Sequence, residues 1–171
     1  MALVVLLVAL LASCAGAQRV GDAGVTVALP RGWSSLSPHA VAGVTPHIVD
    51  PLTRVVVASG PIGFAPTDCQ VAAYSFPRDG VAVIVVEWRR PNGAPYRPHR
   101  FTPRELPVLP PPALECWDGP GGATFFSDHR RTFGAYVLLG RNAPAGRADE
   151  ARAVLDSLRV TTRAAARRRG S

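Results

Sequence analysis

The chain has 171 residues, 47% of them hydrophobic, and a formal net charge of +7. Once a short leader is removed, that length suits one domain with a single core. All 19 basic residues are arginines, and four lie in the last nine residues, so the folded part is only mildly basic. Because the arginines are scattered and not interleaved with stacking aromatics, the composition argues against nucleic-acid binding. The absence of lysine excludes a Walker A loop, a Schiff-base lysine and a Ser-x-x-Lys nucleophile pair.

The first 13 residues predict a cleavable signal peptide for export. Residues 2–12 form an uncharged apolar run, which suits a signal-peptide core and is shorter than the roughly 20 residues that span a membrane. The run ends in Leu11, Ala12, Ser13 and Cys14, which resembles the lipobox of bacterial lipoproteins. That resemblance implies cleavage before Cys14 and a lipid on Cys14 that anchors the chain to the cell membrane, outside the cytoplasm.

Ordinary secretion is the alternative to the lipid anchor. Residues 15–17 fit the small-x-small rule for secretory cleavage, and a cut after Ala17 would release a soluble protein that begins at Gln18. The apolar run also lacks a preceding Lys or Arg, although a positive amino-terminal region is usual in signal peptides. We favour the lipid anchor, with secretion left open.

Either cut leaves Cys69 and Cys116 as the thiols of the domain. Two cysteines outside the cytoplasm usually pair, so we expect a disulfide between them. On the chain-entropy model this bridge would stabilise the fold by roughly 4 kcal/mol. Two separate buried cysteines are the alternative.

The remaining chain is expected to form a tether over residues 14–23, one α+β domain over 24–162 and a disordered arginine-rich tail over 163–171. Apolar alternation and β-branched runs predict strands at 24–30, 54–59 and 81–88, and a hairpin at 122–139 with its turn at 128–131. Residues 91–112 hold eight prolines, a composition that forbids a regular helix or central strand. Apolar residues recur every three or four positions over 148–158, which predicts a helix with one stripe on the sheet.

These elements make a mostly antiparallel sheet of about five strands with a packed C-terminal helix. A strand ending in Leu-Pro-x-Gly-Trp at residues 29–33, a long central strand, an arginine-phenylalanine hairpin and a closing helix follow one another. This order is similar to the PsbP-like sandwiches found among bacterial lipoproteins. The resemblance covers residues 24–160 loosely and implies a fold without a catalytic signature.

No nucleophile elbow, zinc helix, Cys-x-x-Cys pair or EF-hand loop occurs, and no two histidines have the spacing of a metal pair on one helical turn. We therefore expect no metal and no cofactor. The candidate contacts for a ligand or partner lie at the hairpin turn and at two tryptophans: His129, Arg130, Arg131, Trp33 and Trp117. Trp88 shares a strand face with Val86, which favours a core position for it.

The hypothesis favoured by these features is a non-enzymatic module that binds an envelope protein or a small ligand outside the membrane. The alternative is an envelope hydrolase in which Asp128 tunes His129 as a base. No activated nucleophile is evident beside that pair, and a polar turn is common because turns are solvated. A structural spacer with no partner is the third possibility.

Overall fold

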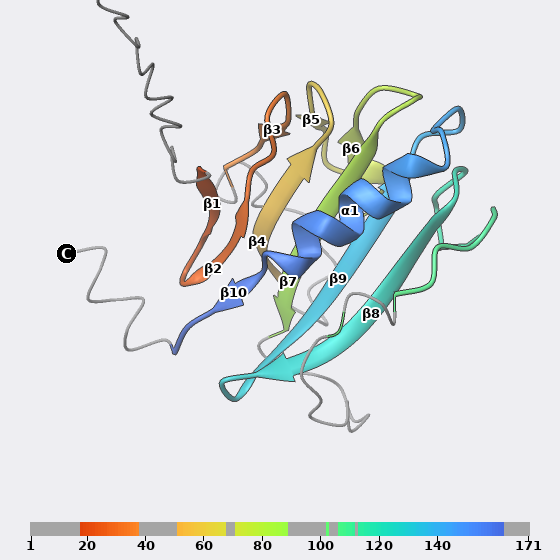
Figure 1. The fold of residues 1–171 in the computed structure, drawn as a ribbon. Helices are drawn as coiled ribbons and strands as arrows, with labels where there is room; N and C mark the ends of the chain where they lie inside the picture. The colour runs from red at the N-terminus through yellow and green to blue at the C-terminus, as the bar shows by residue number, and fades with distance from the viewer. Residues whose placement is uncertain are drawn as a thin grey trace, which may run out of the picture.

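The centre of the domain is a five-stranded antiparallel sheet with the strand order β3-β4-β7-β9-β8 (Figure 1). The computed structural model describes residues 18–37, 51–67, 71–88, 102, 106–111 and 113–162. The strands of this sheet are β3 (Ser34–Ser35), β4 (Pro51–Ala58), β7 (Val81–Trp88), β8 (Gly121–Asp128) and β9 (Arg131–Leu139). The sequence-based expectation of an α+β fold with a mostly antiparallel sheet of about five strands is therefore confirmed.

Hydrophobic side chains cover both faces of this sheet, which is why its central strands are β-branched runs. In β7 the first seven of eight residues are buried, and successive residues contribute to opposite faces. One face packs against helix α1 (Gly146–Asp156), which lies diagonally across the strands (Figure 1) and buries Ala151, Val154 and Leu155. The other face holds Ile84 and Val86, and Trp88 packs beside them as expected.

Short elements complete the second face of the sheet. A 3-10 helix, η2 (Val71–Ala73), leads into β6 (Tyr74–Ser75), which pairs with β5 (Gly63–Phe64). Tyr74 is buried there, and burial raises the pKa of its phenol to about 12. The aromatic and aliphatic side chains of these elements cover the valines of the central strands.

The tether interpretation is wrong for residues 19–22, because they form strand β1 (Arg19–Asp22). β1 pairs antiparallel with β2 (Val25–Ala28), and β2 pairs on its other side with β10 (Arg159–Val160). The turn between β1 and β2 has φ values of 48° at Ala23 and 76° at Gly24, the conformation of a two-residue hairpin turn. The folded domain thus begins by residue 19.

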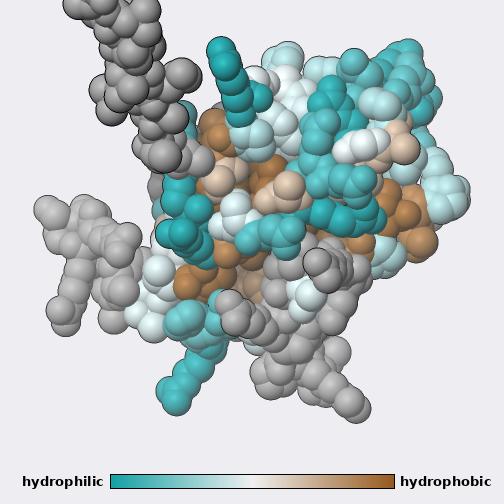
Figure 2. All heavy atoms as spheres, viewed as in Figure 1, coloured by the Kyte–Doolittle hydropathy of each residue, from teal (hydrophilic) through white to brown (hydrophobic). Residues whose placement is uncertain are grey.

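Part of the proline-rich segment belongs to the core. Leu106 is 1% exposed and packs in the cluster on the α1 face, and Leu109 pairs with Gly121 at the edge of β8. On that side of the molecule hydrophilic residues cover most of the surface, with apolar residues visible between them (Figure 2). Leu109 is the exposed large hydrophobic residue of the described chain.

Several expectations concern residues outside the described ones: the signal peptide, Cys14, Cys69 and the tail 163–171. Within the described ranges, no helix is both long enough and apolar enough to cross a membrane. The expected hairpin is present as β8 and β9, and the chain has one described α-helix, α1, which precedes β10. The strands β3, β5, β6 and β10 were not expected, because two residues are too short for a periodic pattern.

Candidate functional site

The tip of the β8–β9 hairpin presents the candidate residues His129 and Arg130. Both have positive φ, 50° and 59°, which is uncommon for residues other than glycine and matches the twist of a two-residue hairpin turn. In this turn the Nδ1 atom of His129 lies 2.8 Å from Oδ1 of Asp128. The side chains of His129 and Asp128 are 43% and 36% exposed, so the pair is open to solvent.

A cleft of about 580 Å³ adjoins this turn, and we call it the tip cleft. Four parts of the chain form it: the hairpin tip, the end of α1, the segment with β10, and Thr102. Its apolar lining residues are Phe126, Leu155, Leu158 and Val160, and its polar ones are Thr102, Asp128, His129, Asp156, Arg159 and Thr161. A floor of hydrophobic side chains with a few polar groups around it is the usual composition of a small-ligand site.

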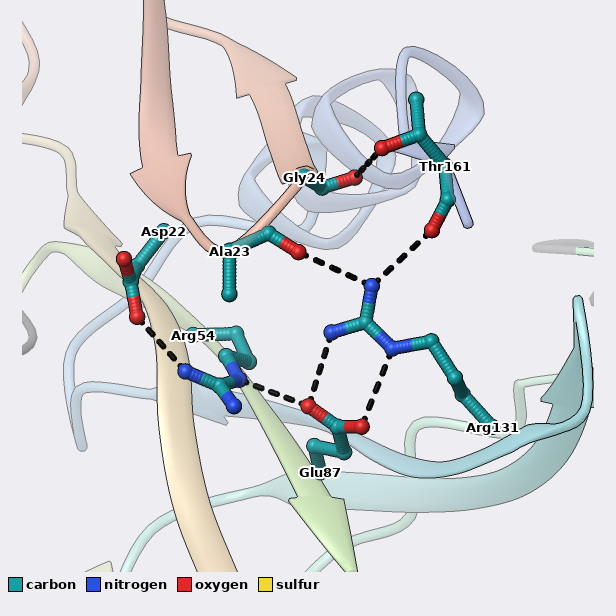
Figure 3. Close-up of polar contacts among 7 residues, drawn as sticks. All are labelled: Asp22, Ala23, Gly24, Arg54, Glu87, Arg131 and Thr161. Carbon is teal, nitrogen blue, oxygen red and sulfur yellow. Dashed lines mark hydrogen bonds and ion pairs between the residues drawn. The ribbon is translucent and has the colours of Figure 1, made fainter. Parts of the chain in front are cut away.

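A buried cluster of charged side chains lies beside the tip cleft, and Figure 3 shows it. We call Asp22, Arg54, Glu87 and Arg131 the Glu87 cluster. Glu87 is fully buried and accepts hydrogen bonds from Arg131 Nη2 at 2.7 Å and Nε at 3.0 Å. Arg54 Nε donates to Glu87 at 2.8 Å, and Arg54 Nη1 donates to Asp22 at 2.6 Å. The two arginines and two carboxylates balance in charge.

Arg131 also connects the cluster to the main chain. Its Nη1 donates to the carbonyl oxygens of Ala23 at 2.9 Å and Thr161 at 3.0 Å (Figure 3). Its guanidinium carbon lies 5.2 Å from the centre of the Phe133 ring, a cation–π distance. At 3% exposure, Arg131 is directed inward, so its guanidinium positions Thr161 at the tip cleft and does not face a partner from outside.

The structure does not gather all the candidate residues at one site. Trp33 is half-buried and packs against the core cluster on the α1 face. Trp117 packs against the cluster on the opposite face, where it lines a second cleft. Only His129 and Arg130 are exposed at the hairpin tip.

The lining of the tip cleft brings the imidazole of His129 together with two threonine hydroxyl groups. Its hydroxyl groups belong to Thr102 and Thr161, and Thr161 Oγ1 donates to the carbonyl of Gly24 at 3.4 Å. A nucleophilic hydroxyl needs a base within hydrogen-bond reach, and the bond that the Thr161 hydroxyl donates goes to Gly24 and not to His129. Over the same described residues, no three His, Cys, Asp or Glu side chains gather as metal ligands.

The Glu87 cluster could not be predicted from the sequence, and neither could the part that α1 and β10 play in the tip cleft. One signal was available, because Glu87 interrupts an otherwise apolar strand. A carboxylate in a strand covered on both faces needs a charged partner. The identity of that partner depends on the register that places Glu87 opposite Phe133 of β9 and Leu52 of β4.

Cys116 takes part in a disulfide. Its partner lies outside the described residues, so the pairing with Cys69 stays a prediction. None of the protein-family models, curated proteins or solved structures compared with the chain matches it.

Proposed function

We propose that the protein is an exported, lipid-anchored envelope protein that acts as a non-enzymatic binding module, with the tip cleft as its binding site. One observation carries the binding proposal: a ligand-sized cleft of about 580 Å³ with an apolar floor and a charged rim. The proposed export and lipid anchor rest on the signal-peptide-like leader and on the lipobox resemblance of residues 11–14. A PsbP-like sandwich is our proposal for the fold family.

The lining of the tip cleft favours a small amphipathic ligand. Leu155 and Phe126 at its floor are almost fully buried, so a hydrocarbon group placed there would leave water. The rim carries charges of both signs, with Asp156 and Arg159 at the end of α1 and in β10. A ligand with an apolar body and one charged head meets both features.

Backbone amide shifts in an NMR titration test this proposal. We suggest octanoate, octylamine and phenylalanine as probes, since they combine an apolar group with a negative, a positive or both charges. At least one probe is expected to shift the amides of residues 126–129 and 155–161, and Arg159→Ala is expected to change its affinity. Arg152→Ala is the matched control, because Arg152 lies outside the cleft lining and pairs with Asp149. No saturable shift with any of the three would contradict the proposal.

Hydrolysis of envelope material is the second candidate, favoured by the 2.8 Å contact between Asp128 and His129. A carboxylate on Nδ1 leaves Nε2 available as a base. Turnover of chromogenic esters, amides or glycosides that disappears in a folded His129→Ala variant would favour this candidate. Equal background rates in both proteins would exclude it for those substrates.

Mass spectrometry tests both the proposed lipid anchor on Cys14 and the proposed disulfide between Cys69 and Cys116. An acylated Cys14 at the mature amino terminus supports the anchor, whereas an unmodified Gln18 terminus contradicts it and indicates secretion. A mass gain of two hydrogen atoms on reduction, with a linked peptide that holds Cys69 and Cys116 before reduction, supports the proposed pairing. Reaction of Cys69 with an alkylating reagent before reduction would contradict it.

A further inference from the structure

A second cleft, of about 360 Å³, lies around Trp117, and it shares no lining residue with the tip cleft. We call it the Trp117 cleft. Its wall is built from η2 and the segment that follows it, the turn that begins at Cys116, and the loop after β9. Its lining includes Phe76, Arg78, Trp117, Asp118, Gly140 and Arg141.

Two aromatic rings form one side of the Trp117 cleft. The rings of Phe76 and Trp117 are stacked, with centroids 5.4 Å apart and planes inclined by 21°. Trp117 Nε1 donates to the carbonyl of Pro120 at 3.1 Å, so the polar atom of the indole is satisfied within the protein. The half-buried rings therefore offer the cleft an apolar surface with no polar group to satisfy.

The rim of the Trp117 cleft has an excess of positive charge. Arg141 and Asp118 form an ion pair across it, and both side chains are mostly exposed. Arg78 is exposed as well, and no ion pair of its side chain occurs within the described part of the chain. A guanidinium in this position can bind a carboxylate through two parallel hydrogen bonds.

The wall of the Trp117 cleft is held in place by close contacts between main-chain segments. A Cβ atom at Gly140 would lie 2.1 Å from the carbonyl oxygen of Arg78, and one at Gly119 would lie 2.2 Å from that of Leu139. The amide of Asn142 donates to the same Arg78 oxygen at 2.8 Å. The backbone that carries Arg78 is thus fixed beside the loop after β9 before any ligand binds, which lowers the ordering cost of binding.

We propose that the Trp117 cleft binds one sugar-acid unit, a pyranose ring that carries a carboxylate. The ring's C–H face lies on the stacked Phe76 and Trp117, and its carboxylate accepts hydrogen bonds from Arg78. The carboxylate of Asp118 accepts hydrogen bonds from ring hydroxyls. This last contact separates a sugar acid from an aryl carboxylate, which matches the rings and the arginine but has no hydroxyl to donate.

The indole N–H signals of the three tryptophans report on the proposal, because only Trp117 lines this cleft. We suggest titrating the protein with glucuronate, glucose, benzoate and inorganic phosphate while these signals are followed by NMR. Glucuronate is expected to shift the Trp117 signal saturably and more tightly than the other three. Arg78→Ala is expected to weaken glucuronate binding at least about tenfold, the effect of losing a charge-assisted hydrogen bond.

Arg31→Ala is the matched control, since Arg31 is also exposed and lines neither cleft. The proposal is overturned if glucuronate leaves the Trp117 signal unchanged or if Arg78→Ala binds it as tightly as Arg31→Ala. Equal binding of benzoate would indicate a site for aryl acids, and equal binding of phosphate a site that recognises negative charge alone. The titration follows the indole N–H signal of Trp117, which does not line the tip cleft, so its outcome is independent of ligand binding there.

Discussion

Replacing Glu87 with glutamine is expected to cost the protein a large part of its stability. The Glu87 carboxylate is fully buried and accepts three hydrogen bonds of 2.7–3.0 Å from Arg131 and Arg54. Glutamine has nearly the same shape but no charge, and it would direct an NH₂ group toward an arginine that can only donate. The guanidinium groups of Arg131 and Arg54 would then face one carboxylate in this cluster, that of Asp22, which accepts a hydrogen bond from Arg54 at 2.6 Å (Figure 3).

Breaking a buried ion pair by removing one partner costs about 3–5 kcal/mol, because the remaining charge stays buried without compensation. We expect the free energy of unfolding to fall by about that amount in Glu87→Gln. For a domain of this size the midpoint of thermal unfolding would fall by roughly 6–20 °C. The loss is a large fraction of the roughly 5–15 kcal/mol that stabilise a typical native protein.

Urea unfolding followed by circular dichroism measures this difference, provided that the slope with denaturant stays constant. Glu150→Gln is the matched control, because Glu150 also contacts an arginine at 2.7 Å but its side chain is 44% exposed. An exposed pair of that kind contributes only about 0.2–1 kcal/mol. Equal losses in the two variants would refute the argument that burial makes the Glu87 cluster important.

Three further predictions concern single positions. Gly140→Ala is expected to lower the free energy of unfolding by at least about 2 kcal/mol in urea titrations, because the new Cβ would meet the Arg78 carbonyl at 2.1 Å. Gly146→Ala is the control: it has open space around it and should leave the free energy of unfolding unchanged. Arg130→Gly should relieve the backbone strain of a left-handed φ of 59°. We expect the free energy of unfolding to rise by about 1 kcal/mol, and the midpoint of unfolding with it. Burial raises the pKa of Tyr74 from 10 to about 12, so the neutral phenol stabilises the fold fully below pH 10 and this stabilisation is lost as the pH rises toward 12. The free energy of unfolding should therefore fall by up to about 3 kcal/mol over this range, and Tyr74→Phe should remove that pH dependence in unfolding curves.

The parts of the fold that could be predicted from the sequence have long, regular patterns. The β-branched run of β7 and the alternation in β8 and β9 are visible without any tertiary information. Strand β1 has a single large apolar residue, Val20, so its sequence predicts a tether and not a strand. Its pairing with β2 depends on the turn at Ala23 and Gly24, where a positive φ at alanine is not a pattern that sequence reading expects.

The candidate site was predictable only in part, because its residues come from distant positions. The hairpin turn with His129 is a local feature, and sequence patterns located it. The cleft beside it also needs Leu155 from α1 and Val160 from β10, which reach it through the packing of the helix on the sheet. Periodicity identifies the buried stripe of a helix but not the element that the stripe covers.

Arg130 and Arg131 are adjacent in the sequence, and they too show that a local pattern does not identify the partner of a side chain. Both follow His129 in the sequence, yet Arg130 is exposed in the turn and Arg131 is 3% exposed in β9. The alternation of a strand directs Arg131 toward Glu87, 44 positions earlier in the chain, and no local pattern gives the identity of that partner. The inward arginine holds the carbonyl groups of Ala23 and Thr161 together at the point where the first hairpin and the end of the domain meet. Hydrophobic contacts at this junction would tolerate small shifts of one segment over another. The guanidinium of an arginine has five N–H donors in a fixed geometry, so its hydrogen bonds do not tolerate such shifts. The Glu87 cluster thus accounts for the placement of Thr161 at the tip cleft, although neither Glu87 nor Arg131 lines it.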